Sequence, residues 1–318
     1  MGRLDEIAAA AESIYRHMRP TPEYCWPLIC ERAGTEVWVK HENHTPIGAF
    51  KLRGGLVYLD DLMKSAPETR GVIAATRGNH GQSVAYAARR AGIEAVVVVP
   101  RGNSVEKNRA MAALGAELIE HGEDFNAAHD RAGELAAERG LHPFPSYHPL
   151  LVRGVASYGL ELFRAVPDLD TVYVPIGLGS GIVGVISARD ALGLKTRVVG
   201  VVAERAAAYA LSFEAGRPIS TETCDTLADG VSVRVPSAEA LEVILKGAER
   251  VVAVSEDEIE AAMRAYYSDT HNLAEGAGAA PLAALLKEKD RMAGRKVGLI
   301  LSGGNVDAEV YRRILAGG

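Results

Sequence analysis

Short apolar runs alternate with helix-forming stretches along most of the chain, and this alternation constrains the fold more than any other feature. The apolar runs have the length of buried parallel strands. They lie at residues 35–40, 71–75, 94–99, 171–176, 197–202 and 297–301. Stretches rich in Ala, Glu, Arg and Leu lie at residues 80–90, 105–114, 125–139, 181–192, 256–267 and 276–287. The pattern predicts an α/β fold with helices on both faces of mostly parallel sheets.

Length and charge narrow the classes of protein to consider. A chain of 318 residues, 48% of them hydrophobic, is long enough for two domains with separate cores. The Pro- and His-containing stretch 141–149 interrupts the helical pattern, and we expect the chain to cross between domains there. A net charge of -6 without a basic cluster argues against nucleic acid or an anionic membrane as a partner. No transmembrane run is found, and a small-molecule ligand is expected.

The cysteines and the N-terminal residues indicate the cellular compartment of the protein. Cys25, Cys30 and Cys224 are odd in number and lack CxxC spacing, which predicts neither a disulfide framework nor a zinc site. We expect them to be core residues in a reducing compartment. The N-terminus has no apolar signal core, so a cytoplasmic protein is expected.

Four loops at the carboxyl ends of predicted strands contain the candidate chemistry, because open α/β sheets place their ligands there. They are Lys51 with its upstream strand end at residues 40–43, and the segments 76–82, 175–184 and 301–307. The second and third lead from a strand into a helix, so their backbone N–H groups can face an anion. Lys51, beside Phe50 and between glycines, suits a buried amine that forms a Schiff base. A single lysine is more often exposed, and only the other three loops favour the buried interpretation.

The third loop also matches a different motif. Residues 179–184 read GxGxxG, and Glu204 follows the next strand where a dinucleotide site has its acidic residue. This interpretation gives no role to Lys51, Asn79 or Ser302. We therefore keep it as the weaker alternative.

Taken in order, these motifs resemble a known family. They are Lys40-x-Glu42-Asn43, Gly48-Ala49-Phe50-Lys51-x-Arg53-Gly54, Gly78-Asn79-His80-Gly81-Gln82, the mid-chain glycine loop and Ser302-Gly303-Gly304-Asn305. The chain resembles the fold-type-II pyridoxal-phosphate enzymes, with a tryptophan synthase β-like fold, and most of all their threonine/serine dehydratase and serine racemase branch. The resemblance implies two doubly wound open-sheet domains. The large cofactor-binding domain would comprise residues 1–52 and 149–318, and the small substrate-closing domain residues 53–148.

The resemblance also implies roles for residues. Lys51 would bind pyridoxal 5'-phosphate as a Schiff base and act as the catalytic base. Phe50 would pack against the cofactor ring, Asn79 would hydrogen-bond its 3-oxygen and Ser302 would face its pyridine nitrogen, with Glu275 nearby. The phosphate would be bound by the loop Gly177, Leu178, Gly179, Ser180 and Gly181. The substrate would be bound by Thr76, Arg77, Gly78, Asn79 and His80. The alternative for Ser302 is an N-cap of the final helix.

Departures from the family pattern bear on the reaction. In serine racemases, a serine that acts as acid/base on the opposite face stands where this chain has Arg77. Because a guanidinium stays protonated, efficient racemisation is not expected. Arg77 would instead contact a polar or acidic substrate group, or it would form a salt bridge or face solvent. The acids that bind a divalent cation in the racemase branch are missing around Ala208, so no metal site is expected, with Glu204 as the reservation. Residues 154–157 replace the usual Gly-Gln-Gly-Thr, which weakens an assignment to ordinary threonine dehydratase.

The expected activity is a dehydratase, or ammonia-lyase, that eliminates water from a β-hydroxy-α-amino acid. Candidate substrates are threonine, serine, threo-3-hydroxyaspartate, 3-phenylserine and hydroxyectoine-derived amino acids. The alternatives are an amino-acid racemase, a β-replacement synthase and a noncatalytic cofactor-binding protein. The resemblance suggests a homodimer. Because no regulatory domain follows residue 318, feedback by isoleucine is not expected.

Overall fold

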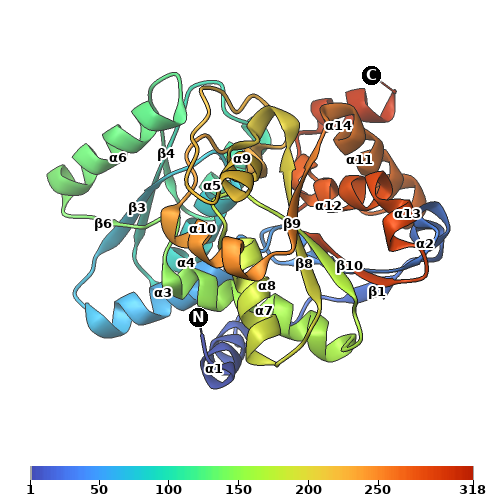
Figure 1. Ribbon diagram of the computed structural model, residues 1–318. Coiled ribbons are helices and arrows are strands. Elements are labelled where there is room, and N and C mark those ends of the chain that lie inside the picture. The colour runs from blue at the N-terminus through green and yellow to red at the C-terminus, as the bar shows by residue number, and fades with distance from the viewer. Residues whose placement is uncertain (1, 318) are drawn as a thin grey trace.

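The structure, a computed structural model describing residues 2–317, contains two β-sheets (Figure 1). The larger sheet has the strand order β1-β2-β10-β7-β8-β9, and its pairs are parallel except for the antiparallel β1–β2 pair. Its strands are β1 (Glu23–Cys25), β2 (Glu36–His41), β7 (Thr171–Pro175), β8 (Arg197–Ala203), β9 (Arg250–Val254) and β10 (Lys296–Leu301). The smaller sheet has the order β5-β4-β3-β6 and is parallel throughout. Its strands are β3 (Gly71–Ala75), β4 (Glu94–Val99), β5 (Glu117–Glu120) and β6 (His142–Pro143).

Helices cover both faces of each sheet. They are α1 (Leu4–Tyr15), α2 (Pro27–Ala33), α3 (Lys51–Ser65), α4 (Asn79–Ala91), α5 (Val105–Ala113), α6 (Phe125–Arg139), α7 (Pro149–Ala165), α8 (Ser180–Ala191), α9 (Ala208–Ala215), α10 (Ala238–Gly247), α11 (Glu256–Thr270), α12 (Gly276–Lys287), α13 (Lys289–Met292) and α14 (Ala308–Leu315). Three short 3₁₀ turns are η1 (Glu42–His44), η2 (Glu204–Ala206) and η3 (Asp229–Val231).

Alternating side chains of the central strands divide each interior into two cores. In β7, Val172 and Val174 pack with α7 and α8, whereas Tyr173 packs on the opposite face with α11 and α12. In β4, Val97 joins the core under α3 and α4, and Val98 joins the core under α6. This is the period-two alternation of a strand buried on both faces. The prediction of an α/β fold with doubly wound open sheets is confirmed.

The predicted elements are found, and additional ones accompany them. All six predicted strands and all six predicted helices are present, with ends that differ by at most a few residues. The sequence interpretation missed the short edge strands β1 and β6, the strands β5 and β9, and several helices, among them α1, α3 and α7. No helix in the described residues is long and apolar enough to cross a membrane.

The cysteine prediction is wrong in one respect. Cys25 is exposed and Cys30 and Cys224 are only partly buried, so none of the three is a core residue. The Sγ atoms of Cys25 and Cys30 lie 3.5 Å apart, at the end of β1 and within α2. The two thiols are close because α2 begins at Pro27, two residues after β1 ends at Cys25.

The stretch 141–149 lies where the chain leaves the smaller sheet. Its residues His142 and Pro143 form the edge strand β6, where a proline costs little because one side of the strand is unpaired. Every later strand belongs to the larger sheet. The exact domain limits, 1–52 with 149–318 and 53–148, stay a prediction.

A network of buried charges links the N-terminal segment to the start of α3. The guanidinium of Arg53 forms paired hydrogen bonds with Glu42, at 2.7 and 2.9 Å, and with Glu161 of α7, at 2.6 and 2.8 Å. The ammonium of Lys40 donates to Glu161 at 2.6 Å and to Glu23 at 2.7 Å. Each charge in this network has an opposite partner, as burial requires.

Candidate active site

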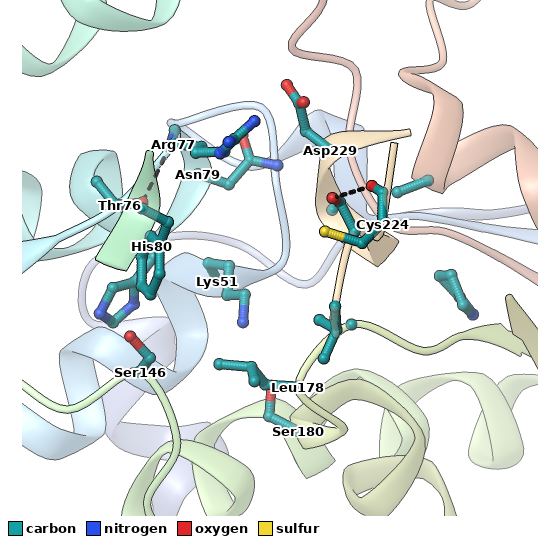
Figure 2. A pocket seen from close by; sticks show the side chains of 18 of the residues that line it. Lys51, Thr76, Arg77, Asn79, His80, Ser146, Leu178, Ser180, Cys224 and Asp229 are labelled. Atoms are coloured by element: carbon teal, nitrogen blue, oxygen red, sulfur yellow. Dashed lines mark hydrogen bonds between the residues drawn. The ribbon is translucent and has the colours of Figure 1, made fainter. Parts of the chain in front are cut away.

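One cavity of about 450 Å³ contains every predicted site residue in its wall (Figure 2). They are Phe50, Lys51, Thr76, Arg77, Gly78, Asn79, His80, Gly177, Leu178, Gly179, Ser180, Gly181, Glu275 and Ser302. These residues come from four loops far apart in the sequence and from the start of α12. The carboxyl ends of the strands bring the four loops together, as the position of the loops predicted.

Lys51 is the first residue of α3 and is held there by the end of β10. Phe50 N donates to the Ser302 carbonyl at 3.0 Å, and Ala49 forms a bridge with Gly303. The amine of Lys51 points into the cavity (Figure 2). Burial lowers its pKa to about 8, although the Glu275 carboxylate acts in the opposite direction. A larger share of this amine is therefore neutral, and nucleophilic, than in an exposed lysine.

The third loop forms the N-terminus of α8. Gly179 has a φ of 101°, a left-handed conformation that favours glycine, and a Cβ there would lie 2.5 Å from Ala240 Cβ. The N-terminus of α8 has no side-chain cap, and Gly179, Ser180 and Gly181 line the cavity. Its free N–H groups can therefore bind an anion.

Asn79 and Glu275 meet across the cavity wall. Asn79 Nδ2 donates to both oxygens of Glu275, at 2.8 and 3.1 Å. Asn79 Oδ1 accepts from Asn305 Nδ2 at 2.8 Å, and Asn305 Nδ2 also donates to the Ile47 carbonyl. Burial raises the pKa of Glu275, and Lys107 and Asn79 act against that rise. These contacts fix which way the Asn79 amide faces.

Ser302 is buried at the end of β10 and lines the cavity. The alternative that it caps the final helix is wrong, because α14 begins at Ala308 with Asp307 as its N-cap residue. Ser302 therefore presents a neutral hydroxyl to the cavity.

The loop 76–80 opens α4 beside Lys51. Thr76 Oγ1 accepts from Gly78 N at 3.0 Å, which shapes the turn (Figure 2). His80 is partly buried, and desolvation, with Lys51 nearby, lowers its pKa to about 3, so the imidazole is neutral. Arg77 is exposed, and among residues 2–317 it has no ion-pair partner. The salt-bridge alternative for Arg77 is not found.

The cavity wall also contains residues that the sequence interpretation missed. Among them are Lys107, Asp124, Ser146, Cys224, Asp229 and Arg234. Lys107 lies inside a helix whose pattern is ordinary, and Asp229 lies in a segment without periodicity. No local signal marks either residue, because the fold alone brings them to the cavity.

The alternative ligand sites have no counterpart in the described part of the chain. Glu204 is ion-paired with Lys287 at 3.2 Å and is not part of the cavity wall, so it cannot serve a dinucleotide bound at the glycine loop. Within residues 2–317, no group of three or more His, Cys, Asp or Glu side chains could hold a metal ion.

The residues fit pyridoxal 5'-phosphate. The amine of Lys51, with its lowered pKa, can bind an aldehyde, the N-terminus of α8 can bind a phosphate, and Ser302 can meet a ring nitrogen without adding charge. All three features face one cavity.

Comparison with known proteins agrees with this fit. The sequence model of the family "Pyridoxal-phosphate dependent enzyme" matches residues 14–303. The L-threonine ammonia-lyase of Thermotoga maritima is 34% identical over 98% of this chain and 78% of that protein. The processed form of threonine deaminase isoform 2 from Solanum lycopersicum has a TM-score of 0.90 at 30% identity, covering 99% of this chain and 95% of that one. Maize serine racemase has a TM-score of 0.92 at 28% identity, covering 99% and 97%.

The predicted family, fold and cofactor are thereby confirmed. The chain belongs to the fold-type-II pyridoxal-phosphate dependent enzymes, in the threonine/serine dehydratase family.

Proposed function

We propose that this protein is a pyridoxal-phosphate dependent ammonia-lyase that eliminates water from a β-hydroxy-α-amino acid, giving a 2-keto acid and ammonia. The observation that supports the proposal most is the amine of Lys51, which is partly buried, has a lowered pKa and faces the same cavity as the α8 N-terminus, Asn79 and Ser302. Relatives named L-threonine ammonia-lyase and L-threonine dehydratase agree with it.

Individual residues have distinct proposed roles in the reaction. Lys51 would hold the cofactor covalently and, once released by the incoming amino acid, its Nζ would remove the Cα proton. Thr76 and the N–H groups of residues 78–80 would bind the substrate carboxylate at the start of α4. The cofactor, when bound, supplies an electron sink for the carbanion at Cα.

The cofactor contacts are part of the proposal. Residues 177–181 would bind the phosphate, Phe50 would pack against the ring and Asn79 would face its 3-oxygen. Ser302 would accept or donate at the pyridine nitrogen without keeping it protonated as an aspartate would. An unprotonated ring would withdraw less charge from Cα, which would favour loss of the β-hydroxyl.

Racemisation needs a second proton carrier on the face of the substrate opposite Lys51. The residue at the position of the racemase serine is Arg77, which keeps its proton at any working pH. We therefore place elimination ahead of racemisation, although a serine racemase is among the similar structures. The homodimer and the cytoplasmic location remain predictions.

A substrate panel tests the proposal. The purified holoenzyme is given threonine, serine, threo-3-hydroxyaspartate, 3-phenylserine and hydroxyectoine-derived amino acids without a thiol, and ammonia and keto acid are measured. We expect both products from at least one substrate and none from Lys51→Ala. A substituted amino acid that forms only when a thiol is added would favour a β-replacement synthase. Conversion of the substrate to its opposite enantiomer without release of ammonia would favour a racemase. An absorbance change without any product would favour a noncatalytic binding protein.

A further inference from the structure

Lys107 lies in the cavity wall, although the proposed reaction gives it no role. Its side chain is 10% exposed, and its Nζ donates to Asp229 Oδ2 at 3.0 Å. Helix α5, which carries Lys107, packs against α4 and β5 of the smaller sheet. The turn η3, which carries Asp229, packs against α12 over the larger sheet. The ion pair therefore joins the two halves of the cavity wall.

The stem of Lys107 passes directly over the loop that opens α4. A Cβ on Gly78 would lie 2.6 Å from Lys107 Cδ, closer than side chains approach. The Lys107 stem therefore occupies the space next to Gly78 Cα. Lys107 is thus in contact with the loop that contains Asn79.

Glu275 is the centre of a group of charges from four segments. It accepts two hydrogen bonds from Asn79 Nδ2. Burial raises the pKa of Glu275, Lys107 lowers it, and Asp229 raises it. Lys107, Asp229, Glu275 and Asp307 also line one small cavity together, and Lys51 and Glu275 both line the active-site cavity.

We propose that Lys107 is a positioning residue that keeps Glu275 ionised, so that Glu275 holds the Asn79 amide facing the cofactor. An ionised carboxylate accepts hydrogen bonds at both oxygens, whereas a protonated one carries an O–H donor on one of them, so Asn79 Nδ2 would lose one of its two acceptors. The amide could then turn away. The inference rests on the proposed role of Asn79 beside the cofactor.

An alternative is that the ion pair only holds the two halves of the cavity wall together, as a mechanical clasp. The structure offers a control for this alternative. Two other contacts join the first turn of α5 to the segment before α14. Ser104 Oγ donates to Asp307 Oδ1, and the Ala308 N–H donates to Glu106 Oε1 at 3.0 Å. Glu106 is not part of the cavity wall, so Glu106→Ala loosens the clasp without removing a charge next to Glu275.

The test compares four variant holoenzymes with the parent protein: Lys107→Met, Lys107→Arg, Asp229→Asn and Glu106→Ala. For each, the absorbance of the bound cofactor and kcat/KM for the best β-hydroxy amino acid are measured against pH. We expect Lys107→Met to move the acid limb of both curves to higher pH by about one unit, because an opposite charge near the carboxylate is lost. We expect Asp229→Asn to move the limb to lower pH, and Lys107→Arg to restore the parent curve. Glu106→Ala should leave the limb in place.

Several results would overturn the inference. One is an acid limb of the pH curve that lies at the same pH in Lys107→Met and in the parent protein. Another is an acid limb that moves equally in Lys107→Met and Glu106→Ala. If Lys107→Met does not fold, the pH curve of Asp229→Asn still tests the inference. An acid limb that stays in place or moves to higher pH in Asp229→Asn would contradict it. If no protein releases ammonia from any substrate, the proposed function fails, yet the absorbance curves still report on Glu275.

Discussion

At the scale of single residues, the environment of Lys51 makes its amine reactive. Burial removes water from the ammonium and lowers its pKa to about 8, and the Glu275 carboxylate partly offsets this effect. The neutral amine is the form that bonds to an aldehyde, so its share rises as the pH increases through about 8.

This pKa predicts how the apoenzyme takes up its cofactor. The rate at which absorbance of bound pyridoxal phosphate appears should rise with pH around a midpoint near 8. In Glu275→Gln the midpoint should move to lower pH, because the carboxylate that favours the ammonium is lost. Titration of the free cofactor is common to both proteins and cancels in the comparison. An unmoved midpoint in Glu275→Gln would show that Glu275 does not act on Lys51.

Arg77 supplies a second prediction at this scale. It is exposed, lines the cavity and lacks an ion-pair partner among the described residues, so its guanidinium is available to a second acidic group of the substrate. We expect Arg77→Ser to lower kcat/KM for threo-3-hydroxyaspartate at least about tenfold more than for threonine, because a charged hydrogen bond contributes about 1.5–3 kcal/mol. Equal losses on the two substrates would contradict this role.

At the scale of elements, the N-terminus of α8 illustrates how a glycine can be required for two reasons. Gly179 has a positive φ, and a Cβ there would also collide with Ala240. Gly193, just after the other end of α8, has a φ of 67°, but a Cβ added there would have no atom within 4 Å. Both alanine variants should lose about 1 kcal/mol from the left-handed conformation.

Only Gly179→Ala should also weaken cofactor binding, by at least about tenfold, because relief of the collision moves the N–H groups that we propose as the phosphate site. Fluorescence titration of the two apoenzymes with pyridoxal phosphate measures this difference. Similar dissociation constants for Gly179→Ala and Gly193→Ala would argue against a phosphate site at the N-terminus of α8.

The start of α3 depends on the buried charges around Arg53. Arg53→Met would leave the carboxylates of Glu42 and Glu161 without their main partner, and such a loss costs about 3–5 kcal/mol. Arg3, whose ion pair with Asp5 is exposed, provides the control, and Arg3→Ala should not measurably change stability. Chemical denaturation of the holoenzymes measures both. A midpoint for Arg53→Met equal to that of Arg3→Ala would contradict the prediction.

Elements with a strong pattern could be predicted from the sequence, and elements defined by long-range contacts could not. The strands β3 and β4 are continuous apolar runs, so their burial on both faces is visible in their composition. Helix α7 was missed because its glycines and buried Ser157 look unfavourable for a helix until their contacts with α3 are known. Lys51 could be singled out from its neighbours, whereas Lys107 reaches the cavity only because α5 crosses over Gly78.

At the scale of the whole molecule, α3 connects the two sheets. It packs against α4 beside the smaller sheet and against α7 beside the larger one. Its first residue is Lys51, so the placement of α3 against α7 also sets the position of the reactive amine relative to the glycine loop. The two helices approach closely because Gly54 and Gly154 face one another: a Cβ on Gly154 would lie 2.9 Å from Gly54 Cα.

This contact leads to a prediction about the whole protein. A Cβ on Gly154 would lie 2.4 Å from the Arg53 carbonyl oxygen, a backbone atom that can move only with α3. Gly154→Ala should therefore cost about 1–3 kcal/mol of stability and also weaken cofactor binding, because Lys51 moves with the helix. Gly133→Ala is the matched control, since Gly133 is also inside a helix but a Cβ added there would have no atom within 4 Å. That variant should gain up to about 1 kcal/mol and bind the cofactor normally. If Gly154→Ala lost stability but kept the parent affinity for pyridoxal phosphate, α3 would not transmit the contact to Lys51, and the cavity would be set by the loops alone.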